Sequence, residues 1–428
     1  MPSISDRELK RLRASVDELS ALNQIATAIN MSMSVDKITR VVLDCCLKKI
    51  RASQGAVFLV DDDRTDIDNA RTFVRESIDE EGTLPFHLHK SLLGWMTKNK
   101  ALLVMNEPDS DSRFAGSNFQ NSGIKSVLAA PLITRSGLIG LLVLFNSEMS
   151  DGFNENDKRF LGIVGTQTAR VIENARLFEK EQQLQALEEE MKVASTIQRG
   201  LLPRKNISEN DYELVGFNEP AKAIGGDYYD MLRLSNERVF IAVGDVSGKG
   251  VPAALLAAKA QAVVRSLLQT GSQMPMDQLV SCLNNSFWES TQPEQFVTAF
   301  MAIYDSTTRK LQYVSAGHTP PYVVSSNGVI RTLTEGNLIV GVVPDTPYIT
   351  SETVLEAGET LAVYTDGVTE CFSPESEEYG ESRLEAFLSG HATDTPEILI
   401  DTLVSELADF RSEATQSDDI TLLLLKAK

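Results

Sequence analysis

Four short segments in the C-terminal half of the chain each place an acidic residue beside a run of β-type residues. They are residues 224–230 (IGGDYYD), 244–250 (GDVSGKG), 364–367 (YTDG) and 417–421 (SDDIT). Buried carboxylates cost several kcal/mol each unless they are paired or bind a cation. Only a folded domain could gather segments that lie so far apart along the chain. Their meeting would require a hard cation such as Mg²⁺ or Mn²⁺, which prefers oxygen ligands.

The charge and the apolar runs argue against several classes of partner. The 428 residues carry 40 basic and 60 acidic side chains, which gives a net charge of −20. A negative field of this size argues against nucleic acid and membrane as partners. The chain begins without an apolar signal region, its apolar runs are too short for a membrane helix, and its four cysteines have no metal-ligand or redox spacing. We expect a cytoplasmic protein with two or three domains.

Two stretches predict long helices. Apolar positions at heptad-like spacing predict an N-terminal helix over residues 1–30. A second helical pattern runs from residue 157 to 202 and ends at Pro203. Its last part, residues 176–203, favours a coiled-coil linker helix that makes a homodimer; a single amphipathic helix lying on a domain is the alternative. The apolar seam of this linker consists of Leu177, Leu184, Leu187, Met191, Ala194 and Leu201.

Residues 31–175 alternate strand and helix patterns and resemble a GAF domain, a small sensory module. The resemblance implies an antiparallel sheet flanked by helices, and a small-molecule or protein signal as its partner. No motif identifies that ligand. The patterns behind the resemblance are β-type runs at 56–60, 126–133 and 138–145, the last two joined by a TRSG turn, a helical segment around residues 94–95, and a helix start at 153–157 (FNEND).

Residues 204–428 combine many short β-type runs with two helical stretches, 252–268 and 276–290. Several strands with grouped helices predict a layered α+β domain with two sheets and helices outside. The β-type runs are residues 212–217, 239–243, 297–304, 311–315, 360–364 and 420–425.

The four acidic segments, together with residues 315–318 (SAGH), stand in the order and spacing of the metal-dependent protein phosphatases, the PPM family. The block is most similar to the bacterial SpoIIE/RsbU branch, and residues 194–203 (ASTIQRGLLP) resemble the helix that leads into the domain in that branch. The resemblance implies an αββα sandwich and a protein serine/threonine phosphatase.

The resemblance also implies the ligands of two Mn²⁺ or Mg²⁺ ions. Asp227 and Asp245 would bind the two-metal centre, with Asp245 bridging and the backbone carbonyl of Val246 adding a ligand. Asp366 and Asp418 would complete the shell of the other ion. The alternative to Asp418 is its neighbour Asp419, should the register differ by one residue.

Three further polar residues of this block invite a functional reading. Lys222, five residues before Asp227, is expected to bind a phosphate oxygen of the substrate, with a solvated lysine as the alternative. Asp230 is expected to be structural. His318 is expected to brace a loop rather than act as a general acid.

Two divalent ions would lower the pKa of a shared water, and the hydroxide would attack phosphoserine or phosphothreonine without a protein nucleophile. The SpoIIE/RsbU resemblance implies a STAS-domain anti-anti-sigma protein as substrate, in a partner-switching pathway regulated by the GAF domain. The alternative is a catalytically inactive scaffold that binds an anti-sigma partner, which the intact aspartates argue against. A nucleotidyl cyclase is rejected because Tyr228 and Tyr229 follow the GGD motif, and the GDVSGKG segment lacks phosphate-loop spacing.

Overall fold

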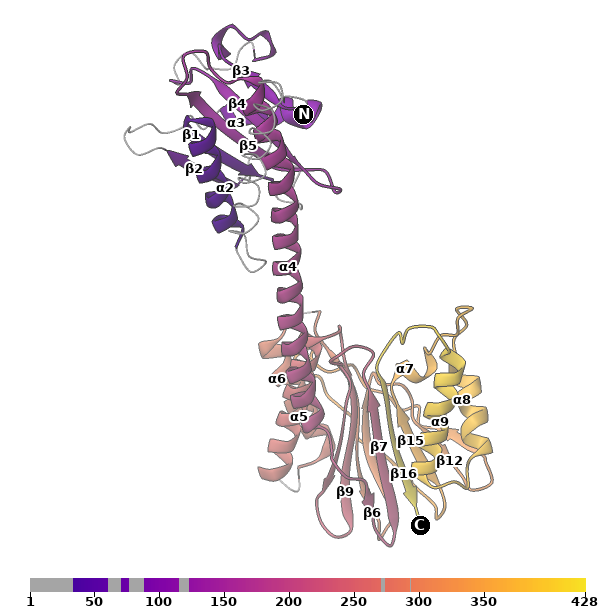
Figure 1. Ribbon diagram of the computed structural model, residues 1–428. Coiled ribbons are helices and arrows are strands. Elements are labelled where there is room, and N and C mark those ends of the chain that lie inside the picture. The colour runs from indigo at the N-terminus through magenta and orange to yellow at the C-terminus, as the bar shows by residue number, and fades with distance from the viewer. Residues whose placement is uncertain (1–33, 61–70, 77–87, 115–122, 271–273, 293) are drawn as a thin grey trace. The chain divides into compact units, whose positions relative to one another are not determined.

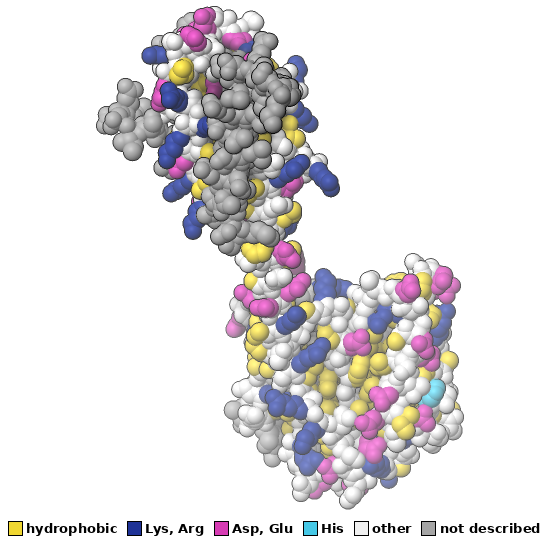
Figure 2. Space-filling model, viewed as in Figure 1, with side chains coloured by type: hydrophobic (Ala, Val, Ile, Leu, Met, Phe, Trp, Pro, Cys, Tyr) yellow, Lys and Arg dark blue, Asp and Glu magenta, His cyan; other side chains and the backbone are white. Residues whose placement is uncertain are grey.

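The computed structural model describes residues 34–60, 71–76, 88–114, 123–270, 274–292 and 294–428. The helix that the sequence predicts over residues 1–30 lies outside these residues. The chain forms two compact units, Met1–Ala186 and Leu187–Lys428. Basic and acidic side chains are interspersed on the viewed face of each unit (Figure 2).

The N-terminal unit is built on one antiparallel sheet. Its first elements are α2 (Val35–Ile50), β1 (Ala52–Leu59), β2 (Arg71–Glu76), α3 (Leu88–Asn99), β3 (Leu103–Met105), two short 3₁₀ helices (Pro108–Ser110 and Ser112–Phe114), β4 (Val127–Ile133) and β5 (Leu138–Ser147). The strand order is β2-β1-β5-β4-β3. The predicted hairpin between β4 and β5 is confirmed, and the Thr134 N–H donates to the Gly137 carbonyl oxygen at 2.8 Å.

Both faces of this sheet are buried. Side chains of α2 and of α4 (Glu155–Leu201), the helix that follows β5, pack on one face. Side chains of α3 pack on the other face. Successive residues of β5 therefore enter two different cores, as Leu142 and Leu141 do. This explains why residues 138–145 form a continuous apolar run instead of an alternating one.

The helix α4 is 47 residues long and confirms the long helical pattern. Its start is capped: Asn154 Oδ1 accepts from the Asp157 N–H at 3.2 Å, and Asp157 Oδ2 accepts from the Asn154 N–H at 2.9 Å. The last residue of α4 that is buried is Ala175. Beyond it the apolar seam is solvent-exposed in this single chain, for example at Leu184, which is 54% exposed. Pairing of this seam with a second copy stays a prediction.

The C-terminal unit contains two antiparallel sheets. The strands are β6 (Ile207–Ser208), β7 (Tyr212–Glu219), β8 (Tyr228–Arg233), β9 (Arg238–Val246), β10 (Val297–Asp305), β11 (Lys310–Ala316), β12 (Tyr322–Val324), β13 (Ile330–Thr332), β14 (Ser351–Val354), β15 (Thr360–Tyr364) and β16 (Ile420–Ala427). One sheet has the order β14-β11-β10-β9-β8, and the other has the order β13-β12-β15-β16-β7-β6.

Helices cover the outer face of each sheet. They are α5 (Val251–Thr270), α6 (Met276–Ser290), α7 (Asp366–Thr369), α8 (Gly380–Gly390) and α9 (Pro396–Arg411). One core joins α5 and α6 to the first sheet, a second lies between the sheets, and a third joins the other sheet to α8 and α9. Figure 1 shows these layers, with α5 and α6 on one side and α8 and α9 on the other. The predicted αββα sandwich is confirmed.

The sequence analysis identified α5 and α6 but not α8, α9 or β8. The start of α9 does carry a local signal, since Pro396 occupies its first turn and Thr395 Oγ1 accepts from the Ile398 N–H at 3.4 Å. Among the described helices, α5 alone is as long and apolar as a membrane span. Its buried side, which includes Ala257 and Val264, packs in the core against the first sheet.

Candidate metal centre

Antiparallel pairing brings the four acidic segments together at one end of the sandwich. The end of β9 lies beside the start of β8, because Tyr228 pairs with Gly244. In the other sheet the end of β15 lies beside the start of β16, because Tyr364 pairs with Leu422. Each sheet therefore contributes one strand start and one strand end to the same place.

Asp227 is the residue where the two sheets meet. It is 4% exposed and immediately precedes β8. Its Oδ2 accepts from Thr365 Oγ1 at 2.7 Å and from Thr421 Oγ1 at 2.6 Å, and both threonines belong to the other sheet or its end. Burial, and then the neighbouring Asp245 carboxylate, raise the pKa of Asp227 well above its ordinary value, while the two hydroxyls act in the opposite direction.

Asp245 lies at the end of β9, opposite Thr298 of β10. Burial and the Asp366 carboxylate raise its pKa to about 6, and a side-chain hydrogen bond with Asp227 opposes the rise. Ionisation of neighbouring carboxyl groups is unfavourable in a buried site. A metal cation would offset that cost.

Asp366 begins α7 directly after β15, and its pKa is raised by burial and by Asp418. Asp418 lies just before β16 and makes a different set of contacts. Its Oδ2 is 2.8 Å from Lys249 Nζ, and its Oδ1 accepts from the Asp419 N–H at 2.9 Å. The Asp418 side chain is 32% exposed, so it lies at the open rim of the group.

Asp419 lies beside this group and holds a loop. Its Oδ1 accepts from the Ala221 N–H at 2.7 Å, and its Oδ2 accepts from the Gly226 N–H at 2.6 Å and the Asp227 N–H at 3.4 Å. Both oxygens are thus used to fix the backbone that carries Asp227. These contacts favour Asp418 over Asp419 as the ligand from this segment.

Glycine is required where these loops touch. A Cβ on Gly225 would overlap the Asp419 carboxylate, and a Cβ on Gly367 would overlap the Asp419 carbonyl oxygen. A Cβ on Gly226 would lie 2.9 Å from the Val246 carbonyl oxygen, which the sequence analysis proposes as a ligand. The GGD and DG motifs therefore let three backbone segments approach one another closely.

Asp227, Asp245 and Asp366 all have raised pKa values, each with a neighbouring carboxylate among the causes. A divalent cation with oxygen ligands relieves that repulsion, so the residues fit Mg²⁺ or Mn²⁺. Over the described ranges of the chain, no group of three or more His, Cys, Asp or Glu side chains is arranged so that it could hold a metal ion as placed.

The other expected site residues are placed as follows. Lys222 is exposed on the segment between β7 and β8. Asp230 is 1% exposed and pairs with Arg265 of α5, at 2.7 Å between Oδ2 and Nε. His318 is 6% exposed, and burial lowers its pKa to about 4, so it is neutral; its Nδ1 is 3.2 Å from Thr298 Oγ1. These contacts support structural roles for Asp230 and His318.

Two kinds of contact were not anticipated from the sequence. Thr365 of the YTDG segment and Thr421 of the DDIT segment donate hydrogen bonds to Asp227. The sequence patterns predicted roles only for the acidic residues of these segments. Gln198, near the end of α4, forms a paired hydrogen bond with Gly225: its Nε2 donates to the Gly225 carbonyl at 2.6 Å, and its Oε1 accepts from the Gly225 N–H at 3.2 Å. The resemblance of residues 194–203 to a lead-in helix was the available signal.

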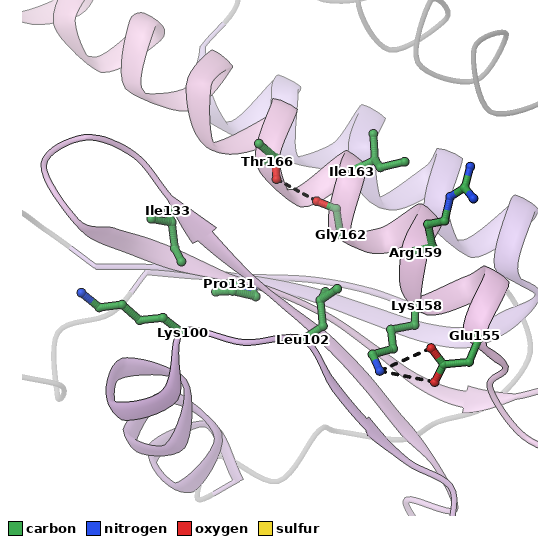
Figure 3. Close-up of a pocket in the computed structure, with 10 residues that line it drawn as sticks. All are labelled: Lys100, Leu102, Pro131, Ile133, Glu155, Lys158, Arg159, Gly162, Ile163 and Thr166. Atoms are coloured by element: carbon green, nitrogen blue, oxygen red, sulfur yellow. Dashed lines mark hydrogen bonds and ion pairs between the residues drawn. The ribbon is translucent and has the colours of Figure 1, made fainter. Parts of the chain in front are cut away.

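The N-terminal unit has a pocket of about 620 Å³ between α4 and the sheet. Its lining includes Pro131 and Ile133 of β4 and Ile163 of α4 (Figure 3). Lys158 lies near the start of α4 and is 3.3 Å from Glu155. The pocket thus combines an apolar interior with a charged margin.

Comparisons with known proteins agree with this architecture. Residues 235–428 match the stage II sporulation protein E (SpoIIE) family, and residues 32–173 match the GAF domain family; Asp227 lies outside the first range. Protein IcfG of Synechocystis sp. is 29% identical over 263 residues, which are 55% of this chain and 41% of IcfG. Phosphoserine phosphatase RsbU of Bacillus subtilis is 29% identical over 245 residues, 57% of this chain and 72% of RsbU.

A solved structure has the same fold as the C-terminal unit. The SiaA PP2C domain of Pseudomonas aeruginosa is similar with a TM-score of 0.51 and 23% sequence identity, over 57% of this chain and 98% of that domain. Together with the two family matches and the αββα sandwich, this agreement covers both units. The chain therefore combines a unit of the GAF domain family with a SpoIIE-type unit that has the PPM fold.

Proposed function

We propose that this protein hydrolyses phosphoserine or phosphothreonine in another protein, using two Mn²⁺ or Mg²⁺ ions. The observation that carries the proposal is the gathering of Asp227, Asp245 and Asp366 at one end of the two sheets, where burial and a neighbouring carboxylate raise the pKa of each. An arrangement of this kind is costly without a cation and is typical of a site that uses one.

Different residues would have different roles in the proposed reaction. When bound, the two ions supply a hydroxide near neutral pH and neutralise charge on the phosphoryl oxygens. Asp227 and Asp245 would hold the centre with the Val246 carbonyl, and Asp366 and Asp418 would complete it. Thr365 and Thr421 fix the orientation of Asp227 through its Oδ2.

The substrate and its binding are part of the proposal. Lys222 is exposed beside the loop that carries Asp227 and would bind a phosphate oxygen of the substrate. We propose a phosphorylated STAS-domain protein of a partner-switching pathway as the substrate, in the cytoplasm and without nucleic acid or membrane as partners. RsbU, to which the chain is similar, is a phosphoserine phosphatase, and this similarity supports the reaction class.

The GAF domain would receive the regulatory signal, either a small molecule or a protein. The pocket beside α4 offers a place for a small ligand, and the exposed seam of α4 offers a place for a second copy of the chain. Gln198 then links the end of that helix to the loop of the metal centre.

Hydrolysis of p-nitrophenyl phosphate tests the reaction. The full-length protein should turn over only with Mn²⁺ or Mg²⁺, and Asp245→Asn should lower the rate at least roughly a hundredfold, because it removes the bridging charge. Asp230→Asn provides a control for the loss of an aspartate that pairs with Arg265 outside the centre. Turnover without metal, or none in the wild type, would contradict the proposal, and the second result would favour the inactive scaffold.

A further inference from the structure

Lys249 brings a side-chain cation to the rim of the metal centre. Its Nζ lies 2.8 Å from Asp418 Oδ2 and donates to the Ser417 carbonyl oxygen, also at 2.8 Å. The other oxygen of Asp418 accepts from a backbone N–H, that of Asp419. The carboxylate that the proposed function assigns to an ion is therefore already neutralised by the chain itself.

The loop between β9 and α5 explains how Lys249 reaches this position. Gly248 has φ +94° and Gly250 has φ +79°, left-handed conformations that favour glycine on either side of the lysine. The base of the loop is fixed, because Ser247 Oγ accepts from the Phe296 N–H at 3.0 Å. The Lys249 side chain is 48% exposed, so the ammonium can leave Asp418 while the loop keeps its shape.

Among the described residues, the Asp227 side chain has no lysine or arginine partner. It accepts hydrogen bonds from Thr365 and Thr421. Lys249 reaches Asp366 only through the electrostatic field, as a minor opposing influence on the pKa of that group. The ammonium is thus directed to Asp418, whose side chain is 32% exposed.

We propose that Lys249 acts as a tethered competitor for the ion bound at Asp418. The ammonium occupies this carboxylate in the absence of that ion and has to leave before the ion can bind, since two cations on one carboxylate repel each other. Binding at Asp418 should therefore be weaker than binding at Asp227 and Asp245. The inference rests on the proposed function only in taking Asp418 as a ligand.

Mn²⁺ binding to the full-length protein tests this directly, by calorimetry and by electron paramagnetic resonance of free Mn²⁺ at constant pH and salt. Lys249→Met should tighten the weaker Mn²⁺ by roughly three- to tenfold, because an exposed ion pair no longer competes. Lys249→Arg keeps a cation beside Asp418 and should stay within about twofold of the wild type. The number of bound ions should not change in either variant.

Two more variants make the result specific. Lys310→Met removes the same charge from an exposed pair with Glu352 on another part of the unit, and it should leave Mn²⁺ binding unchanged. In an Asp418→Asn background, Lys249→Met should have no further effect, since the contested carboxylate is gone. Thermal unfolding of each variant establishes that it is folded.

The outcomes that overturn the proposal are distinct. Unchanged or weaker Mn²⁺ binding in Lys249→Met would show that Lys249 orders the loop or contacts substrate instead. Equally tight Mn²⁺ binding in Lys310→Met would show that the effect comes from the net charge of the protein. If the wild type binds no Mn²⁺, or Asp245→Asn binds it normally, the proposed function itself fails, and that result is independent of Lys249.

Discussion

At the scale of single residues, neighbouring aspartates have opposite surroundings. Asp418 faces a lysine at the rim, whereas Asp419 binds the backbone of residues 221, 226 and 227. Asp227 is buried against Asp245, whereas Asp230, three residues later, pairs with Arg265. The type of residue is the same in each pair, so the difference comes from what the fold places beside it.

The raised pKa values predict how metal-free stability depends on pH. The pKa of Asp245 rises from an ordinary 3.8 to about 6, so between these values the folded state binds more protons than the unfolded state. The free energy of unfolding should therefore fall as the pH rises through this window, by up to roughly 3 kcal/mol.

Thermal unfolding of EDTA-treated protein at pH 4.5 and pH 7 measures this fall. Asp245→Asn should reduce the difference, and excess Mn²⁺ should restore stability at pH 7 because it offsets the charge of the ionised carboxylates. A metal-free protein that becomes more stable across the same window, with Asp245→Asn unchanged, would contradict the prediction.

At the scale of elements, the last turn of α4 is bonded to the rest of the C-terminal unit at two points. Gln198 pairs with Gly225, and Gln261 of α5 donates from Nε2 to the Leu201 carbonyl oxygen at 2.8 Å. One of these contacts holds the loop before Asp227, and the other holds the helix that follows the Lys249 loop. A movement of the last turn of α4 would thus affect both the loop before Asp227 and the helix α5.

Gln198→Ala tests this connection. Loss of two hydrogen bonds at Gly225 should cost about 1–2 kcal/mol of stability and lower Mn²⁺-dependent turnover several-fold, since the loop that positions Asp227 is released. Arg199→Ala changes the adjacent exposed residue of the same helix and should have little effect. Turnover and Mn²⁺ affinity equal to wild type in Gln198→Ala would show that the contact is dispensable.

The sequence predicted most elements whose pattern is local, such as the β4–β5 hairpin, α4, α5 and α6. The strand β8 was missed because its run contains Asp230, a polar residue that only becomes compatible with burial once Arg265 is beside it. The helices α8 and α9 were missed even though Thr395 and Pro396 mark the start of α9. For residues 380–411 the sequence prediction rested on β-type runs and did not include helices.

At the scale of the whole molecule, the exposed apolar seam predicts a dimer. Leu177, Leu184 and Leu187 are 61%, 54% and 51% exposed in the single chain, which is unfavourable unless a second helix covers them. Sedimentation of the full-length protein should therefore give a dimer, and Leu184→Glu should shift it toward monomer. A monomeric wild type would contradict the coiled coil.

The same variants test regulation by the N-terminal half. If the GAF domain acts through the helix, the full-length protein and residues 195–428 should dephosphorylate a STAS-domain protein at different rates. Leu184→Glu should then resemble the fragment. Equal rates for all three would remove the case for control through α4.

The sequence alone predicts the long helix and a layered α+β domain, because apolar periodicity is a local property, and its resemblance to the PPM family implies the αββα class and the set of candidate aspartates. Only the tertiary structure separates Asp418 from Asp419, binds Thr365 and Thr421 to Asp227, and sets Lys249 against the rim. These outcomes depend on burial and on charges that come from distant segments of the chain. Strand pairing brings those segments together, and no run of neighbouring residues encodes their distances.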